Sequence, residues 1–130
     1  MINVDLQKLY TSKLYVDIQN KHLDGDIKVD INIMVEEKKE TIVYLKVTFT
    51  CSDDVILGMI LCGEFIIKGV DNTEIDKIAR INCTSIMFPF LRERVARLTN
   101  DSLLGEPIYL PSVDFSHLYK EWLKKENKEG

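Results

Sequence analysis

The sequence contains few of the residues on which catalytic and metal sites depend. Its 130 residues include two histidines, His22 and His117, and three cysteines, Cys51, Cys62 and Cys83, which form no CxxC pair. A structural zinc site needs closely spaced ligands, and a nucleophilic site needs a serine or cysteine beside an oriented histidine. Neither pattern is present, and no GxGxxG or GxxxxGK loop could hold phosphate. We therefore expect no enzyme, no metal and no cofactor, and either histidine could be a surface residue.

Long apolar runs are also absent. The longest, 55–62, is far shorter than the roughly 20 residues that cross a bilayer. The first ten residues include Asp5 and lack the apolar core of a secretory signal. The odd number of cysteines, each among apolar or β-branched neighbours, indicates buried, reduced thiols. These features predict a soluble cytoplasmic protein.

Positive charge is scarce, because 17 lysines and arginines stand against 21 acids, for a net charge of -4. Affinity for nucleic acid depends on basic surface, so this balance argues against a nucleic-acid partner. Four arginines could contact RNA: Arg80, Arg92, Arg94 and Arg97. They interleave with acids and lack aromatic side chains for base stacking. RNA binding is therefore the weakest alternative.

Aliphatic side chains at regular spacing are what the sequence does contain. With 45% hydrophobic and 29% charged residues, residues 1–130 fit one globular domain. Apolar and polar residues alternate over 14–18, 27–35 and 43–51, which predicts strands with one wet face. Turn residues and the charged run 36–40 separate these strands.

The segment 55–67 is apolar on both faces of a predicted strand. A strand of this kind needs a cover on each side, because large apolar patches are rarely left on monomers. Helices of the same chain can supply one cover, and we expect another subunit to supply the second. The alternative is that a C-terminal element of the same chain covers the second face.

The pattern becomes helical after Asp71. Thr73 is a candidate N-cap, and a second cap in 82–85 predicts another helix from near Ser85, with Pro89 one turn inside it. This second helix has the apolar stripe Phe88, Leu91, Val95 and Leu98. An extended segment between prolines and a final amphipathic helix follow. The predicted fold class is α+β, a four-stranded antiparallel sheet followed by helices on one face.

Two stretches near the C-terminus, "MFPFLRERVARLTN" and "PIYLPSVDFSHLY", resemble the bacterial protein-export chaperone SecB. The matching elements are Phe88-Pro89-Phe90, Arg92-Glu93, Tyr109-Leu110-Pro111, Val113-Asp114-Phe115 and Leu118-Tyr119. The order of the preceding elements is also similar. The resemblance covers roughly residues 7–123, and the C-terminal third is its specific part.

This resemblance implies a cytoplasmic homotetramer, a dimer of dimers with its long helices between the sheets. The implied function is an ATP-independent holdase for unfolded or precursor polypeptides in protein export. The alternative is a chaperone dedicated to one client, such as an antitoxin. Six residues are the candidate polypeptide contacts: Phe65, Ile67, Ile86, Phe88, Phe90 and Tyr109. Phe88 and Phe90 could instead be core residues, because large aromatic side chains dominate cores.

The chain departs from the family at the sheet face that, in the export chaperone, presents acids to the SecA motor. Lys13 and Gly58 stand where the family has acids, and only Asp17 keeps one. The tail "KKENKEG" is not net acidic. Asp17 is therefore the one candidate motor contact, and the departures argue against coupling to SecA.

Overall fold

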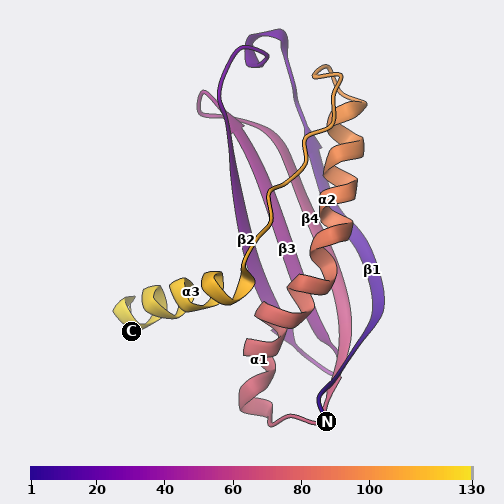
Figure 1. Ribbon diagram of the computed structural model, residues 1–130, viewed down its shortest axis with the longest axis vertical. Coiled ribbons are helices and arrows are strands. Elements are labelled where there is room, and N and C mark those ends of the chain that lie inside the picture. Colours follow the sequence, from indigo (N-terminus) through magenta and orange to yellow (C-terminus); the bar gives the residue numbers. More distant parts are fainter. Residues whose placement is uncertain (130) are drawn as a thin grey trace.

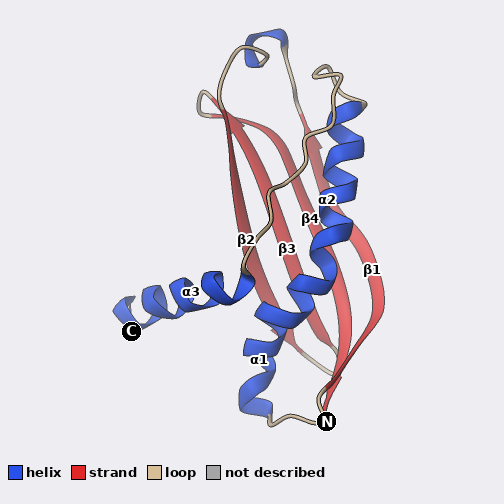
Figure 2. Ribbon diagram, in the orientation of Figure 1, coloured by secondary structure: helices blue, strands red, loops and turns tan. Residues whose placement is uncertain are grey.

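The computed structural model describes residues 1–129 (Figure 1). The strands are β1 (Asn3–Val16), β2 (Ile27–Glu37), β3 (Thr41–Cys51) and β4 (Asp54–Lys68), and the α-helices are α1 (Ile75–Ile78), α2 (Thr84–Asn100) and α3 (Phe115–Glu129). Figure 2 shows α1 and α2 crossing one face of the sheet, and the extended chain after α2 returning over the same face. The predicted α+β class is confirmed.

All neighbouring strands are antiparallel, in the order β1-β4-β3-β2, so that β1 and β2 form the two edges. Strand β1 is much longer than the predicted strand 14–18, which was wrong in extent. The register between β1 and β4 shifts between Leu6 and Lys8 and again between Thr11 and Lys13. Each shift inserts one extra residue, and such β-bulges break the alternation on which the prediction depended.

The core lies between the sheet and α2. Buried and less buried residues alternate strictly along β3, whereas β4 has neighbouring buried residues at Ile56-Leu57 and at 61–63, as the sequence predicted for each strand. The buried side chains of this layer include Val43, Leu45, Val47, Phe49, Leu57, Met59, Leu61 and Phe65. Helix α2 contributes Met87, Leu91 and Val95, one turn apart and fully buried. Phe88 and Leu98 of the predicted stripe are only half-buried, and Met87 is the core residue that the prediction missed.

The helical chain does not break at 82–85 as predicted. Residues Ala79–Cys83 form a π-helical turn that joins α1 directly to α2. The hydroxyl groups that were predicted to cap a new helix instead donate to carbonyls of the preceding turn. Thr84 Oγ1, for example, donates to the carbonyl of Arg80 at 2.6 Å. Pro89 consequently lies well inside the continuous helix, on its exposed side, rather than near an entrance.

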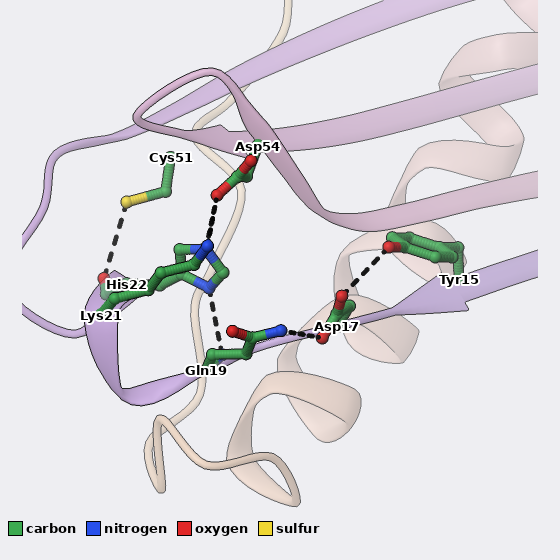
Figure 3. Close-up of polar contacts among 7 residues, drawn as sticks. All are labelled: Tyr15, Asp17, Gln19, Lys21, His22, Cys51 and Asp54. Atoms are coloured by element: carbon green, nitrogen blue, oxygen red, sulfur yellow. Dashed lines mark hydrogen bonds and ion pairs between the residues drawn. The ribbon is translucent and has the colours of Figure 1, made fainter.

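His22 anchors the loop between β1 and β2 to the turn between β3 and β4 (Figure 3). Although its position in a turn would allow a surface histidine, His22 is only 3% exposed. Its Nδ1 accepts the Gln19 backbone N–H at 3.0 Å, which leaves Nε2 to donate to Asp54 Oδ2 at 3.1 Å. This bond, followed by the one from Lys21, holds the pKa of Asp54 below its usual value.

The outer face of the sheet, opposite the helices, is partly covered by its own side chains. Tyr10 and Tyr44 are the cross-strand neighbours of Cys62, and they leave none of it exposed. Met34 and Val55 remain largely exposed on this face. Side chains of the neighbouring strands therefore cover part of the outer face of β4. The rest of this face is not covered within residues 1–129 of this chain.

Candidate polypeptide-binding surface

Helix α2 carries two large apolar side chains on the side that faces away from the sheet. Ile86 is 38% exposed and Phe90 is 43% exposed. They are four residues apart, so they lie one above the other on the same helical face. The inward residues of α2 already fill the core, so packing within this chain does not account for the exposed pair.

A groove of about 510 Å³ lies between α2 and the returning chain, and it is lined by other residues than Ile86 and Phe90. Pro89 and Tyr109 both line it, together with Arg92, Glu93, Ala96, Arg97, Asn100 and Pro107. The Tyr109 side chain is 63% exposed, and the guanidinium of Arg92 lies 5.5 Å from its ring centre. The groove therefore combines an open aromatic wall with charged residues of both signs.

Hydrogen bonds and aromatic packing hold the returning chain in place along α2. Arg92 Nε donates to the carbonyl of Leu110 at 3.0 Å, and the Leu110 side chain is buried in the core. Phe88 packs edge-on against Phe115 at the start of α3, with ring centres 5.6 Å apart. Tyr109 is thus presented outward because its neighbour Leu110 points inward, as expected of extended chain.

The six predicted contact residues do not form one surface. Ile86, Phe90 and Tyr109 are exposed, and Phe88 is half-buried at the flank of α2. Phe65 is fully buried beneath Met87, and Ile67 is half-buried against the core. In this chain, therefore, a polypeptide could reach three of the six side chains directly.

Asp17 lies apart from these residues, directly after β1 and beside the His22 anchor (Figure 3). Its carboxylate accepts the Tyr15 hydroxyl at 3.3 Å and the Gln19 side-chain amide at 3.2 Å. The backbone N–H of Asp17 donates to the carbonyl of Ile56 at 2.9 Å. The side chain is exposed but already engaged.

An aromatic cluster at α3 was not singled out from the sequence. The rings of Tyr119 and Trp122 stack with centres 6.0 Å apart, and a smaller groove of about 170 Å³ separates them from the β2 edge. Ile31 and Ile33 of β2 line its other side. The sequence does contain a signal for this cluster. Its one tryptophan follows a tyrosine by three residues in a predicted amphipathic helix, a spacing that places both rings on the same helical face.

Within residues 1–129, no three histidine, cysteine or acidic side chains gather as a metal site would require. None of the helices described is long and apolar enough to cross a bilayer. Burial raises the pKa of the Cys83 thiol to about 12, which opposes a nucleophilic thiolate.

Comparison with known proteins identifies the family. Residues 3–126 match the family described as preprotein translocase subunit SecB. The protein-export protein SecB of Ruegeria pomeroyi is 30% identical over 115 residues, which cover 78% of this chain and 69% of that protein. That of Dichelobacter nodosus is 27% identical over 141 aligned positions, covering 96% and 88%.

A solved structure has the same fold. It is a SecB-like chaperone of Mycobacterium tuberculosis in complex with a ChAD peptide from the HigA1 antitoxin. It superposes with a TM-score of 0.66 at 12% identity, covering 85% of this chain and 90% of that one. The family match covers nearly the whole chain, and the fold of this chain is that of the solved SecB-like chaperone. The chain therefore belongs to the SecB family of chaperones.

Proposed function

We propose that this protein is an ATP-independent holdase that binds unfolded polypeptides on the exposed side of α2. Members of the SecB family are chaperones rather than enzymes. The observation that carries the proposal is the exposed pair Ile86 and Phe90 on the same helix that forms one wall of the groove lined by Tyr109. Of the other predicted contacts, Phe88 and Ile67 are half-buried and Phe65 is fully buried, so they would offer a client less of their side chains or none.

The chemistry of the surface favours binding without sequence selectivity. Each apolar side chain that a client covers contributes at most about 1.5–3 kcal/mol. Three such side chains on one protomer give weak binding, which several protomers can multiply. We accordingly place the protein in a homotetramer, a dimer of dimers with the helices between the sheets, working in the cytoplasm.

The test measures suppression of aggregation for several unrelated denatured proteins, by light scattering. Phe90→Ser and Ile86→Ser should raise the concentration needed for half-suppression severalfold. Leu103→Ser is the matched control, because Leu103 is 53% exposed but lies in the loop after α2. Equal activity of Phe90→Ser and wild type would remove the α2 surface from the proposal.

The oligomeric mass of the same variants must also be measured, since a helix that lies between two sheets could bury Ile86 and Phe90 against another subunit. If a variant loses client binding while its oligomeric mass is unchanged, Ile86 and Phe90 contact clients. A drop in mass assigns it to the subunit interface instead. Light scattering coupled to size exclusion gives the mass of each variant.

A chaperone dedicated to one client is the second candidate. It is supported by the solved neighbour, a SecB-like chaperone that holds a peptide from an antitoxin. Protection of a single client out of the panel would favour this reading. We do not extend either proposal to SecA, because Lys13 and Gly58 replace acids and the carboxylate of Asp17 is engaged.

A further inference from the structure

The outer face of the sheet has two adjoining depressions. The first, of about 350 Å³, has Gly58 as its floor and Tyr15, Val55 and Ile60 among its walls. The second, of about 250 Å³, lies between Met34, Tyr44 and Ile60. Lys46 and Ile60 line both depressions, so together they form one shallow groove across the sheet.

Gly58 creates the first depression because it leaves a gap in a row of side chains. Tyr15 and Thr48 are its cross-strand neighbours. A Cβ added at Gly58 would meet only the Tyr15 Cβ, at 3.9 Å, which is an ordinary contact. Neither packing nor backbone conformation therefore requires glycine here, and the open floor is available to a ligand.

Two lysines stand over the middle of this groove. Lys13 and Lys46 are the direct cross-strand neighbours of Ile60, one on each side. Both are exposed, and among residues 1–129 neither takes part in an ion pair. The groove therefore presents two unneutralised ammonium groups above an apolar floor, although the chain as a whole has a net charge of -4.

The acids of the same face do not neutralise these lysines. Glu36 binds Lys38 at 3.0 Å and accepts the Tyr44 hydroxyl at 2.7 Å. Asp30 lies opposite Thr48 at the β2 side, and Glu64 lies opposite Lys8, two residues further along β4 from Cys62. Asp17 accepts the hydroxyl of Tyr15, at the end of the first depression away from Lys46. The central position is consequently cationic, with acids only toward its margins.

These charges also argue against a second copy of this chain as the occupant. In a twofold pairing the same patch meets itself, which would bring the central lysines of two copies together. Like charges placed opposite one another across an interface are costly. An acidic partner neutralises the lysines without this cost.

We infer that the outer face is a docking groove for an extended segment of another protein, carrying a carboxylate between two large apolar side chains. Alternate residues of an extended chain point to the same side, so residues i, i+2 and i+4 face the groove together. The apolar side chains enter the two depressions, and the carboxylate binds Lys13 and Lys46. This groove and the α2 surface lie on opposite faces of the sheet, so each can be filled while the other is occupied.

The test uses a fluorescent peptide in which leucine, glutamate and leucine alternate with serine, and a second peptide with lysine in place of glutamate. Anisotropy should show saturable binding of the glutamate peptide only, weakened by added salt. Lys13→Glu and Lys46→Glu should each weaken it at least roughly tenfold, since each sets like charges against one another. Gly58→Ala should weaken it less, by making the floor shallower.

Lys28→Glu is the matched control. It makes the same change of charge on the same face of the sheet, but Lys28 lies outside both depressions. It should bind the peptide as wild type does. Absence of saturable binding by the glutamate peptide overturns the inference, as does equal binding of the lysine peptide. A fall in oligomeric mass in Lys46→Glu also overturns it, because the occupant would then be a second copy.

The same proteins separate this inference from the proposed holdase function. Lys46→Glu should suppress aggregation as wild type does, and Phe90→Ser should bind the glutamate peptide as wild type does. Loss of both activities in one variant would mean that a single surface serves both, which contradicts the assignment to opposite faces.

Discussion

The guanidinium of Arg80 lies 3.7 Å from the centre of the Trp122 ring. Arg80 stands in the π-helical turn before α2, whereas Trp122 lies in α3, which projects past the β2 edge (Figure 1). The same side chain binds Asp76 at 3.0 Å and reaches the carbonyl of Ile33 at 3.4 Å. One arginine thus connects three elements, and the ring of Trp122 brings α3 into this set of contacts.

Replacing Trp122 should loosen α3 without unfolding the sheet. Trp122→Ala removes a cation–π contact worth about 0.5–2 kcal/mol, while Arg80 keeps its bonds to Asp76 and Ile33. Amide hydrogen exchange over 115–129 should become faster, and exchange in β3 and β4 should not change. Lys120→Ala, an exposed change in the same helix, serves as the control. Unchanged exchange in Trp122→Ala would show that α3 is held by other contacts.

Two glycines of β4 should respond oppositely to the same substitution. A Cβ at Gly63 would lie 2.7 Å from Phe65 Cε2 and 2.9 Å from Met87 Sδ, both in the core. Gly63→Ala should therefore lower the free energy of unfolding by about 1–3 kcal/mol. Gly58→Ala finds free space and should be neutral or stabilising by up to about 1 kcal/mol. Urea unfolding measures both, and equal effects would contradict the packing around Met87.

The pair Tyr44 and Glu36 should make stability depend on pH at both ends of the range. The hydrogen bond to Glu36 raises the pKa of Tyr44 from 10.0 to about 12, so its stabilisation is present below pH 10 and lost toward pH 12. The same bond, with Lys38, lowers the pKa of Glu36 from 4.5, so its stabilisation is present above pH 4.5 and lost below it.

Tyr44→Phe should flatten the dependence of unfolding free energy on pH at both ends. Tyr109→Phe removes a hydroxyl from an exposed ring and should leave the wild-type dependence intact. Urea unfolding at a series of pH values measures each curve. Parallel curves for Tyr44→Phe and wild type would mean that the bond to Glu36 does not persist in solution.

The three thiols should be unreactive in the folded protein. Cys51, Cys62 and Cys83 are each fully buried, and burial raises the pKa of Cys83 to about 12. A chromogenic disulfide reagent at neutral pH should label none of them in buffer and all three in denaturant. Rapid labelling of one thiol in buffer would reveal local opening around that residue.

The strands were predictable where their side-chain pattern is uninterrupted, and not elsewhere. Segments 27–35, 43–51 and 55–67 were all assigned correctly, because the first two alternate and the third is apolar throughout, so that a bulge at Ile56 does not disturb its pattern. In β1, the inward residues are Val4 and Leu6, then Leu9 and Thr11, then Leu14 and Val16. Two bulges shift this period, so only the last stretch was readable from the sequence.

The helix and the binding surface show the same limit. Polar residues at 82–85 fit a cap and a π turn equally well, because their hydroxyls can bond forward to N–H groups or back to carbonyls. Phe65, Phe88 and Phe90 are likewise indistinguishable by residue type, yet only Phe90 is exposed. Which aromatic side chain faces solvent is decided by helix phase and by the path of the returning chain.

The π-helical turn at Ala79–Cys83 is a place where the chain can lose a residue without disturbing the fold. Buried positions recur at every fourth residue from Ala79 to Thr99, including Cys83, Met87 and Val95. Loss of one residue inside α2 would rotate everything beyond it by about 100° and carry the buried row out of register with the sheet. Loss of one residue within Ala79–Cys83 would simply restore ordinary helical turns. Single-residue insertions and deletions among relatives of this chain should therefore concentrate there.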